Sequence, residues 1–320
     1  MAAAVGMLDE RHPPLPQDPH DDNTYTLGCV GSHNVVIACL PAGKTGTTSA
    51  ATVAKQMLSS FNSIRFGLMV GIGGGVPSRK NDIRLGDIVV SEPKDNFGGV
   101  IQYDFGKTVE DGRFTCTGSL NSPPAVLLGA VSSLQAKHKM EGHKILEYLS
   151  AMVGKYPVME REFTYQGKEN DQLFEAEYDH RENDSTCENC DMSRLVHRTT
   201  RNRDVPIVHY GLIASGNQVM RYGKARDRLG GELNVLCFEM EAAGLMDNFP
   251  CLVIRGICDY ADSHKNKLWQ GYAAATAAAY AKELLSIIAT SQVENTRTVA
   301  KAISEASKSS LQVLTASAAS

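Results

Sequence analysis

Short runs of apolar, mostly β-branched residues alternate along this chain with longer helical stretches, and that alternation limits the possible folds most strongly. Strands separated by helices form a largely parallel or mixed sheet that is covered on both faces. The sequence therefore predicts an α/β protein of three layers, α/β/α, with a central mixed sheet. The expected strands are residues 35–40, 66–71, 88–91, 207–214, 235–238 and 251–257. The expected helices are residues 48–60, 125–137, 145–153 and 269–289.

A polar stretch interrupts this alternation. Residues 157–206 are rich in Asp, Glu, Arg and Asn and have almost no apolar periodicity, which predicts a long, partly disordered surface insertion. Beyond residue 290 the chain is rich in Ser, Ala and Thr, which is typical of a linker or a loose tail. We expect one domain over residues 1–289, including the insertion, and a tail over residues 290–320.

Composition excludes several classes of protein. With 320 residues, 42% of them hydrophobic, the chain can bury a large core, and a net charge of −4 argues against a nucleic-acid binder. No apolar run approaches the ~20 residues that span a bilayer, and the first residues lack a secretory leader. Most of the eight cysteines are scattered, several in apolar runs, which indicates buried thiols in a reducing compartment. A cytoplasmic protein without membrane partners is expected.

Four glycines follow the second expected strand, in the segment 70–77 (VGIGGGVP). Because glycine has no Cβ, its backbone can come close to a ligand. The spacing does not match the G-x-G-x-x-G dinucleotide fingerprint, and residues 43–45 (GKT) lack the earlier glycine of a phosphate-binding loop, since Ala38 stands there. The run is therefore either a ligand-binding loop or a tight strand exit.

Acidic residues follow two later strands. Glu239 and Glu241 flank Met240 where a strand ends and a helix is expected to begin, so they can bind paired sugar hydroxyls or serve as helix N-terminal acids. Asp259 ends the apolar strand 251–257. Poor solvation there favours its protonated form and suits it to proton donation near neutral pH, although a turn or cap residue is the alternative.

These segments, with residues 83–91 (IRLGDIVVS) and 211–217 (GLIASGN), together resemble the nucleoside phosphorylase superfamily. That superfamily includes purine nucleoside phosphorylases and methylthioadenosine/adenosylhomocysteine nucleosidases. The resemblance runs from about residue 26 to residue 289 and is closest to the phosphorylase-like domains of fungal multidomain, immune-receptor-like proteins. Those fungal domains share the whole stretch of residues 216–285 in style, including the segment 258–266 (CDYADSHKN).

The resemblance implies a role for each matching residue. Met240 is expected to lie under the sugar, and Glu241 is expected to bind its 2′ and 3′ hydroxyls. Asp259 is expected to protonate or hydrogen-bond the purine N7, so that the base leaves as a neutral molecule. The other expected ribose and base contacts are Glu239, Val219, Met220, Gly73, Gly74 and Arg255.

Some positions depart from the family pattern. The Arg and Ser that bind phosphate in the phosphorylases correspond to Met69 and Ile72, which cannot bind an anion, so hydrolysis is favoured over phosphorolysis. Ile72 also replaces the serine that helps to hold water in the nucleosidases, and Val219 replaces their purine-stacking aromatic. Basic side chains that could bind a 5′-phosphate, or simply form a solvated face, are Arg79, Lys80, Arg221, Lys224 and Arg226.

The family begins with a strand whose acidic residue orients the nucleophile. This chain opens with residues 1–5 (MAAAV), which resemble the helix just after that strand, so the first strand and its acid are expected to be missing. Such a loss would leave backbone groups unpaired beside the site.

The sequence thus predicts cleavage of the N-glycosidic bond of a purine nucleoside or nucleotide, in nucleoside metabolism or defence signalling. A catalytically impaired nucleoside-binding or signalling module, and a purine nucleoside phosphorylase, are the alternatives. We expect no cofactor, a small-molecule purine partner, no nucleic acid and a homo-oligomer.

The insertion contains His180, Cys187, Cys190 and His197. Two thiolates and two imidazoles could close a tetrahedral structural zinc site. A single C-x-x-C is a weak signal, so a polar loop with incidental cysteines is the favoured interpretation and no metal is expected.

Overall fold

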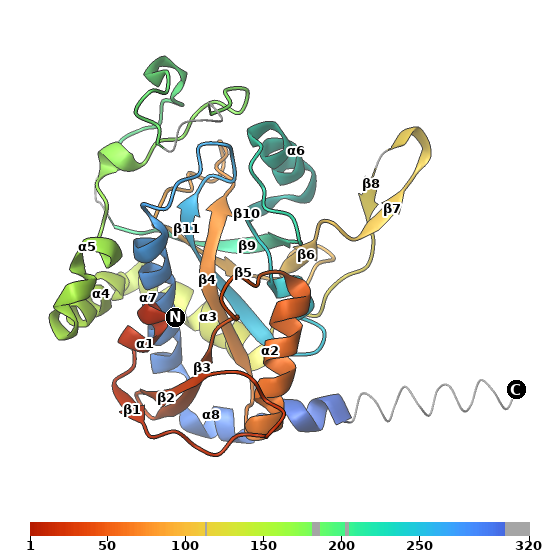
Figure 1. Cartoon of the computed structure of the whole chain (residues 1–320), viewed down its shortest axis with the longest axis vertical. Helices are drawn as coiled ribbons and strands as arrows, with labels where there is room; N and C mark the ends of the chain where they lie inside the picture. Colours follow the sequence, from red (N-terminus) through yellow and green to blue (C-terminus); the bar gives the residue numbers. More distant parts are fainter. Residues whose placement is uncertain (113, 181–185, 202–204, 305–320) are drawn as a thin grey trace, which may run out of the picture.

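The computed structural model describes residues 1–112, 114–180, 186–201 and 205–304 (Figure 1). Two sheets and a projecting hairpin contain all the named strands. The larger sheet has six strands: β4 (Gly67–Gly75), β5 (Ile88–Ser91), β6 (Val100–Gln102), β9 (Val208–Ser215), β10 (Val235–Glu239) and β11 (Cys251–Asp259). The smaller sheet has β1 (Glu10–His12), β2 (Tyr25–Val30) and β3 (His33–Ala38). The hairpin has β7 (Gly106–Thr108) and β8 (Phe114–Cys116).

The larger sheet is mixed, as the sequence predicts. Its order is β10-β4-β11-β5-β9-β6, with β4 parallel to β11, β5 parallel to β9, and β11 antiparallel to β5. β10 pairs with β4 and also with β9, so the sheet curls round and closes on itself. The three-layer α/β prediction is confirmed. The closure was not predicted, because it depends on pairings between strands that are distant in sequence.

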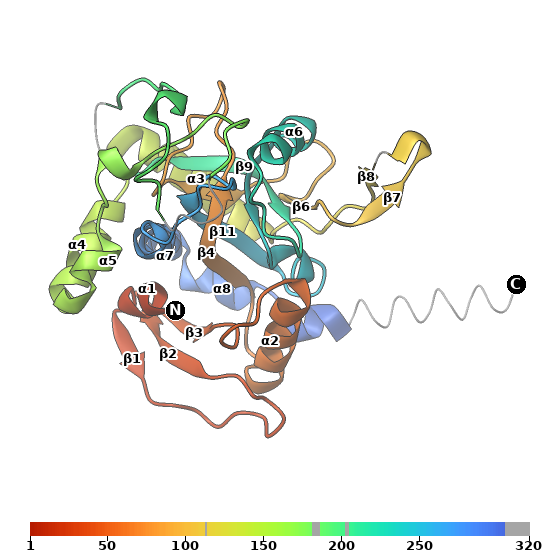
Figure 2. The same ribbon diagram turned by 45° about the horizontal axis from the view of Figure 1, so that its top comes forward.

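Helices cover both sides of this sheet (Figure 2). α7 (Gln270–Ile287) packs on β4 and β11, with α1 (Ala2–Gly6), α3 (Ala125–Glu141), α4 (Ile145–Lys155) and α5 (Glu160–Phe163) beside it. α2 (Thr47–Ser60) and α6 (Gly223–Leu233) lie across from α7, where α6 contacts β10.

The approach of α7 to the sheet explains why this helix is rich in alanine. Its buried alanines leave little side-chain volume between helix and sheet. At Gly256 of β11 a Cβ would overlap the carbonyl oxygen of Ala273, so backbone meets backbone there. None of the helices in the described residues is long and apolar enough to cross a bilayer.

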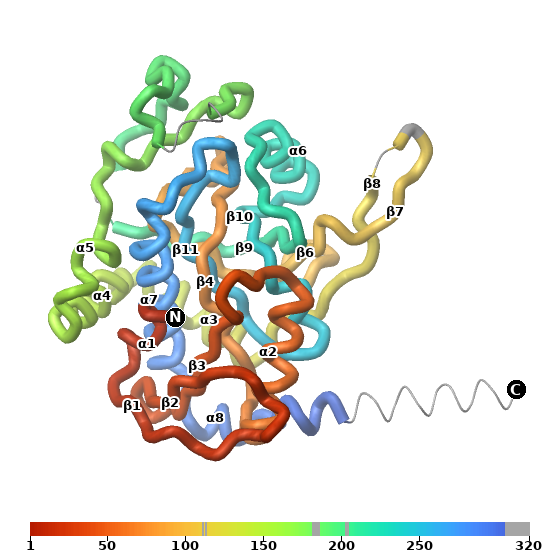
Figure 3. Tube along the Cα trace, viewed as in Figure 1, coloured from red at the N-terminus to blue at the C-terminus, as the bar shows by residue number. Residues whose placement is uncertain are grey.

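The first sixty residues stay outside the larger sheet (Figure 3). They form α1, the three-stranded sheet and α2, so the larger sheet takes no described strand from residues 1–66. β3 pairs only with β2, and β4 pairs only with β11 until Gly74 and Gly75 meet β10. Among the described residues, no strand pairs with the other edge of β4 before Gly74, and the residues of β4 up to Ile72 are half-buried.

The described parts of the tail, residues 290–304, and of the insertion both pack against the body. α8 (Thr290–Asn295) follows α7, and the Val299 N–H donates to the carbonyl oxygen of Ile64 at 2.9 Å. In the insertion, Arg198 donates to the hydroxyl of Tyr260 at 2.7 Å and forms an ion pair with Asp171 at 3.1 Å. The expectation of disorder falls partly on residues 181–185 and 202–204, which lie outside the described residues.

Candidate active site

A cavity of about 1010 Å³ lies along the open side of β4. This volume is at the upper end of the range for small-molecule sites, roughly 300–1,000 Å³. Its lining combines residues that are distant in sequence: the end of β4, the residues that follow β10, the end of β11, and the segment after β9. All the residues predicted for ribose, base and catalysis are in that lining: Gly73, Gly74, Val219, Met220, Glu239, Met240, Glu241, Arg255 and Asp259.

An arginine and two glutamates form one wall. Arg255 Nη2 pairs with Glu239 and lies 3.4 Å from Glu241 Oε2. Glu239 also accepts hydrogen bonds from the N–H groups of Glu241 and Ala242, so it fixes the turn that presents Glu241. A Cβ at Gly71 would overlap Arg255 Nη1, so this glycine makes room for the guanidinium.

Glu241 is held in an environment that disfavours its charge. Burial raises the pKa of Glu241 above its ordinary value, and nearby Glu239 adds to the rise, while Arg255 and the backbone N–H of Gly46 oppose it. Its side chain retains 16% of its exposure and faces the cavity. A partly desolvated carboxylate of this kind is a strong acceptor for a pair of hydroxyl groups.

The glycines after residue 70 lie inside β4 rather than in a separate loop, so neither interpretation of the sequence describes them fully. Gly73 and Gly74 line the cavity, and a Cβ at Gly74 would lie 2.7 Å from Asp259 Oδ1. The glycines thus allow both Arg255 and Asp259 to lie close against the strand.

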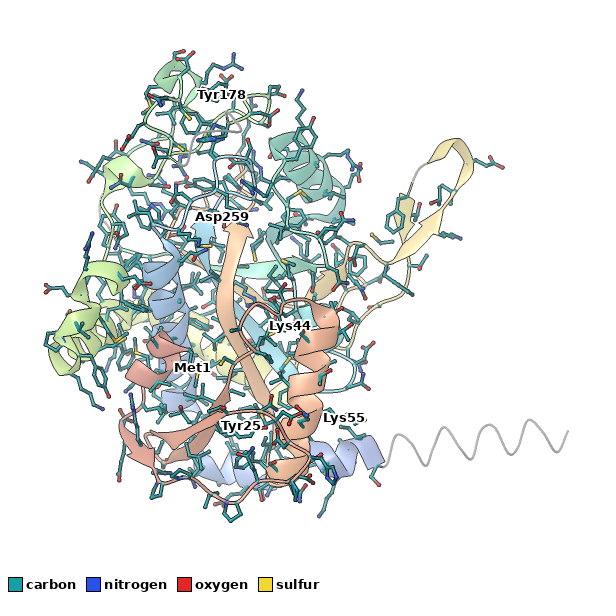
Figure 4. The ribbon with its side chains drawn as sticks, in the orientation of Figure 1. Met1, Tyr25, Lys44, Lys55, Tyr178 and Asp259 are labelled. Carbon is teal, nitrogen blue, oxygen red and sulfur yellow. The ribbon has the colours of Figure 1, made fainter. Side chains whose placement is uncertain are left out.

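Asp259 ends β11 and faces the same cavity (Figure 4). Its Oδ1 accepts from the N–H of Ala261 at 2.9 Å, and its Oδ2 accepts from the Cys258 thiol at 3.1 Å. Lys265 Nζ forms an ion pair with Oδ2 at 3.2 Å. The turn is strained, because Ala261 has a φ of 52°, in the left-handed region. The sequence pattern suggested a poorly solvated acid and gave no indication of Lys265, which comes from the loop that follows.

An apolar wall completes the site. Phe238 lines the cavity with Val219 and Met220. The ring of Tyr103 meets Phe238 edge-on at 5.4 Å, and its hydroxyl donates to the carbonyl oxygen of Gln218 at 2.7 Å, which fixes the segment carrying Val219. The sequence analysis treated Phe238 only as a strand residue, and inward aromatics at strand ends are the signal that could have identified it.

Residues predicted to differ from the family pattern also line the cavity. Met69 and Ile72 both line it. None of the five basic residues proposed for a 5′-phosphate does so, and Arg226 is buried in ion pairs with Asp227 and Asp262. In the described residues Lys265 is instead the cation beside the predicted acid.

Most of the chain matches a known protein family. Residues 7–291 match the Phosphorylase superfamily. A nucleotide-binding leucine-rich repeat (NLR)-like protein of Hyaloscypha variabilis is 52% identical over 289 residues, which cover 90% of this chain and 28% of that protein. The chain therefore spans little more than a quarter of that relative.

Solved structures share the fold at low identity. The futalosine hydrolase of Helicobacter pylori superposes with a TM-score of 0.54 at 15% identity, covering 89% of this chain and 91% of the other. The 5′-methylthioadenosine/S-adenosylhomocysteine nucleosidase of Neisseria meningitidis, in complex with methylthio-immucillin-A, gives 0.53 at 15%, covering 89% and 95%. These structures share the fold, and the sequence match over residues 7–291 shows that the chain belongs to the Phosphorylase superfamily.

Proposed function

We propose that this chain cleaves the N-glycosidic bond of a purine nucleoside or nucleotide by hydrolysis. The observation that carries the proposal is that Asp259 and Glu241 face one cavity beside the apolar wall of Phe238, Val219 and Met220. They come from the ends of β11 and β10, the strands on either side of β4. Related structures support a purine ligand, since a variant of the Helicobacter pylori 5′-methylthioadenosine/S-adenosylhomocysteine nucleosidase holds 5′-methylthioadenosine in its active site.

Each side chain then has a distinct task. Glu241 accepts hydrogen bonds from the ribose 2′ and 3′ hydroxyls, and Met240 packs against the sugar. Asp259 protonates or hydrogen-bonds N7 as the bond between C1′ and N9 breaks, so the electron pair leaves with a neutral base. Water adds to C1′, and the proton that it releases returns to Asp259 or to solvent. Lys265 fixes the orientation of the Asp259 carboxyl group.

The apolar side chains at the end of the cavity favour water over phosphate as the nucleophile. Met69 and Ile72 offer no donor to an anion. Arg255 is already paired with Glu239 and Glu241, and Lys265 is paired with Asp259. A phosphate ion beside Met69 and Ile72 would therefore gain little in return for its desolvation.

A second candidate is a nucleoside-binding module with no turnover. Arg255 engages both Glu239 and Glu241, so neither carboxylate is free to activate water. Among the described residues of the cavity lining, the other acids are Asp259 and Glu294. The binding-module hypothesis predicts nucleoside affinity without release of free base.

One assay separates these functions. The protein is incubated with adenosine, inosine, guanosine, AMP and ATP, with and without phosphate, and free base is measured by chromatography. Phosphate-independent release of base supports hydrolysis, and strictly phosphate-dependent release indicates a phosphorylase. Nucleoside binding measured by calorimetry, with no base released, indicates the binding module. If the protein neither binds these compounds nor releases base from them, the proposal is contradicted.

The similarity to an NLR-like protein supports a place in defence signalling. In that role the domain would change the concentration of a purine nucleotide in response to a signal. The same assay on the full-length NLR-like relative, before and after it is activated, would test this role.

A further inference from the structure

The polar insertion brings together three metal-binding side chains. His180, Cys187 and Cys190 each place a ligand atom within 4.8 Å of the others, and all three are half-buried. In a tetrahedral zinc site with Zn–S bonds of about 2.3 Å and Zn–N bonds of about 2.0 Å, ligand atoms lie roughly 3.4–3.8 Å apart. A contraction of about 1 Å would therefore let this group close on an ion.

The local backbone already has the form that such a site needs. The N–H of Cys190 donates to the carbonyl oxygen of Cys187 at 3.1 Å, and this turn brings the two thiols within hydrogen-bond reach. His180 Nε2 lies 2.9 Å from the carbonyl oxygen of Thr186. Metal-binding imidazoles are commonly oriented by such a contact.

A fourth candidate ligand comes from outside the insertion. His264 is buried, and neither of its ring nitrogens has a hydrogen-bond partner in the described part of the chain. Burying such groups without a partner costs free energy, which a bound ion would offset. Asp262 lies 3.9 Å from Nδ1, so Nε2 can bind a metal while the carboxylate orients the ring.

The distance between the two imidazoles fits a shared ion. The rings of His180 and His264 have centroids 5.3 Å apart. Two imidazoles on one tetrahedral zinc ion have centroids about 5.2 Å apart, from the Zn–N bond length and the tetrahedral angle. The carbonyl oxygen of His264 also lies 3.9 Å from Cys187 Sγ. His264 is outside the 4.8 Å group, so its side chain must shift slightly toward the cysteines.

The geometry points to a structural zinc site formed by His180, Cys187, Cys190 and His264, which fixes the insertion against the loop that follows β11. His197, which the sequence spacing suggested, is not in the group. His264 belongs to a distant segment, so local spacing could not identify it.

This site would also stabilise the catalytic end of the cavity. The N–H of His180 donates to Ser263 Oγ at 2.9 Å, and the ring of Tyr178 stacks on His264 at 5.3 Å. The same loop carries Lys265, which pairs with Asp259. The ion would therefore couple order in the insertion to the position of Lys265.

Metal content tests the proposal directly. The full chain is purified without chelator from zinc-supplemented medium, and zinc is measured by mass spectrometry. About one equivalent is expected in the parent, falling below about a tenth of an equivalent in Cys187→Ser and in Cys190→Ser. Two matched controls, His197→Ala in the same segment and Cys29→Ser, should keep their zinc. Cys29 is a useful control because it lies in a second group of potential ligands, with Glu10 and His12.

The parent protein provides a measurement that does not depend on variants. After zinc is removed by a chelator, added Co²⁺ should give thiolate-to-cobalt charge-transfer absorption and the visible bands of tetrahedral cobalt. Restored zinc should also slow proteolysis within residues 157–206.

Four results would overturn the site: no cobalt spectrum, less than about a tenth of an equivalent of zinc in the parent, a disulfide between Cys187 and Cys190, or zinc retained in the cysteine variants. Unchanged zinc affinity in His264→Asn, measured by chelator competition, would remove His264 as the fourth ligand.

Discussion

Two carboxylates, the buried Asp87 and the half-buried Glu241, have pKa values shifted in opposite directions. Burial alone would raise the pKa of Asp87, but hydrogen bonds and charge from Arg201 and His209 outweigh it and lower the pKa below its ordinary value. For Glu241 burial prevails over Arg255, and the pKa rises. Asp87 is the more deeply buried of the two, so burial alone would raise its pKa further, and the opposite shifts arise from how completely the carboxylate oxygens are paired.

The partners of Asp87 show what complete pairing looks like. Arg201 donates to both oxygens at 2.7 Å, Ile207 N–H and His209 Nε2 each donate at 2.9 Å, and Arg84 N–H does so as well. Glu241 has Arg255 at 3.4 Å and faces a cavity. A fully paired buried acid stabilises a fold, whereas an incompletely paired one beside a cavity retains capacity for a ligand.

The largest expected effect is the loss of base release on substitution of Asp259, the acid that ends β11 and lines the same cavity as Glu241. Asp259→Asn should reduce base release by about 10²–10⁴, because an amide cannot donate the proton. The melting temperature and circular dichroism spectrum should stay close to those of the parent. Asp22→Asn, at an exposed position, is the matched control. A variant with parental turnover would exclude Asp259 from the mechanism.

Asp87→Asn should mainly affect stability. Removing one partner from a buried ion pair costs roughly 3–5 kcal/mol, since Arg201 and His209 would lose their counter-charge. Urea denaturation monitored by fluorescence measures this loss, and the nucleoside affinity of the folded fraction should not change. If the stability of Asp87→Asn stayed parental while its nucleoside affinity fell, Asp87 would act in ligand binding and not in stabilising the fold.

Glu241→Gln should show the reverse pattern. Losing a charge-assisted contact to the ribose diol costs roughly 1.5–3 kcal/mol of binding free energy, or about 10- to 150-fold in affinity. Titration calorimetry with a nucleoside and its 2′,3′-dideoxy analogue measures it. The variant should bind both equally, and a parent protein that already bound both equally would contradict the assignment.

The sequence predicted the elements of this fold well because their apolar periodicity is local. It also predicted that Glu241 and Asp259 would act together, because both follow strands and match family motifs. Lys265 and His264 could not be predicted in this way, because the conformation of the loop after β11 places them against Asp259 and the insertion.

The smallest effect is a pH dependence that arises from the raised pKa of Glu241. The charged form binds the diol, so nucleoside affinity should fall as pH decreases through this pKa. The midpoint should lie above 4.5, the ordinary value for a glutamate. The fall should approach about tenfold per pH unit, because one proton competes with the ligand. Glu241→Gln should remove this dependence.

Stability should depend on pH in the opposite sense at this residue. The folded pKa of Glu241 lies above its unfolded value, so the protonated form favours the fold at low pH. That contribution is lost as pH rises from the ordinary value of 4.5 through the folded pKa, and Glu241→Gln should therefore gain stability relative to the parent over that interval. Asp87 behaves oppositely, since its lowered pKa contributes stability that is lost only as acid protonates it. Denaturation of both variants across this range measures the difference. If the Glu241→Gln curve ran parallel to the parent's, folding would not raise the pKa of Glu241.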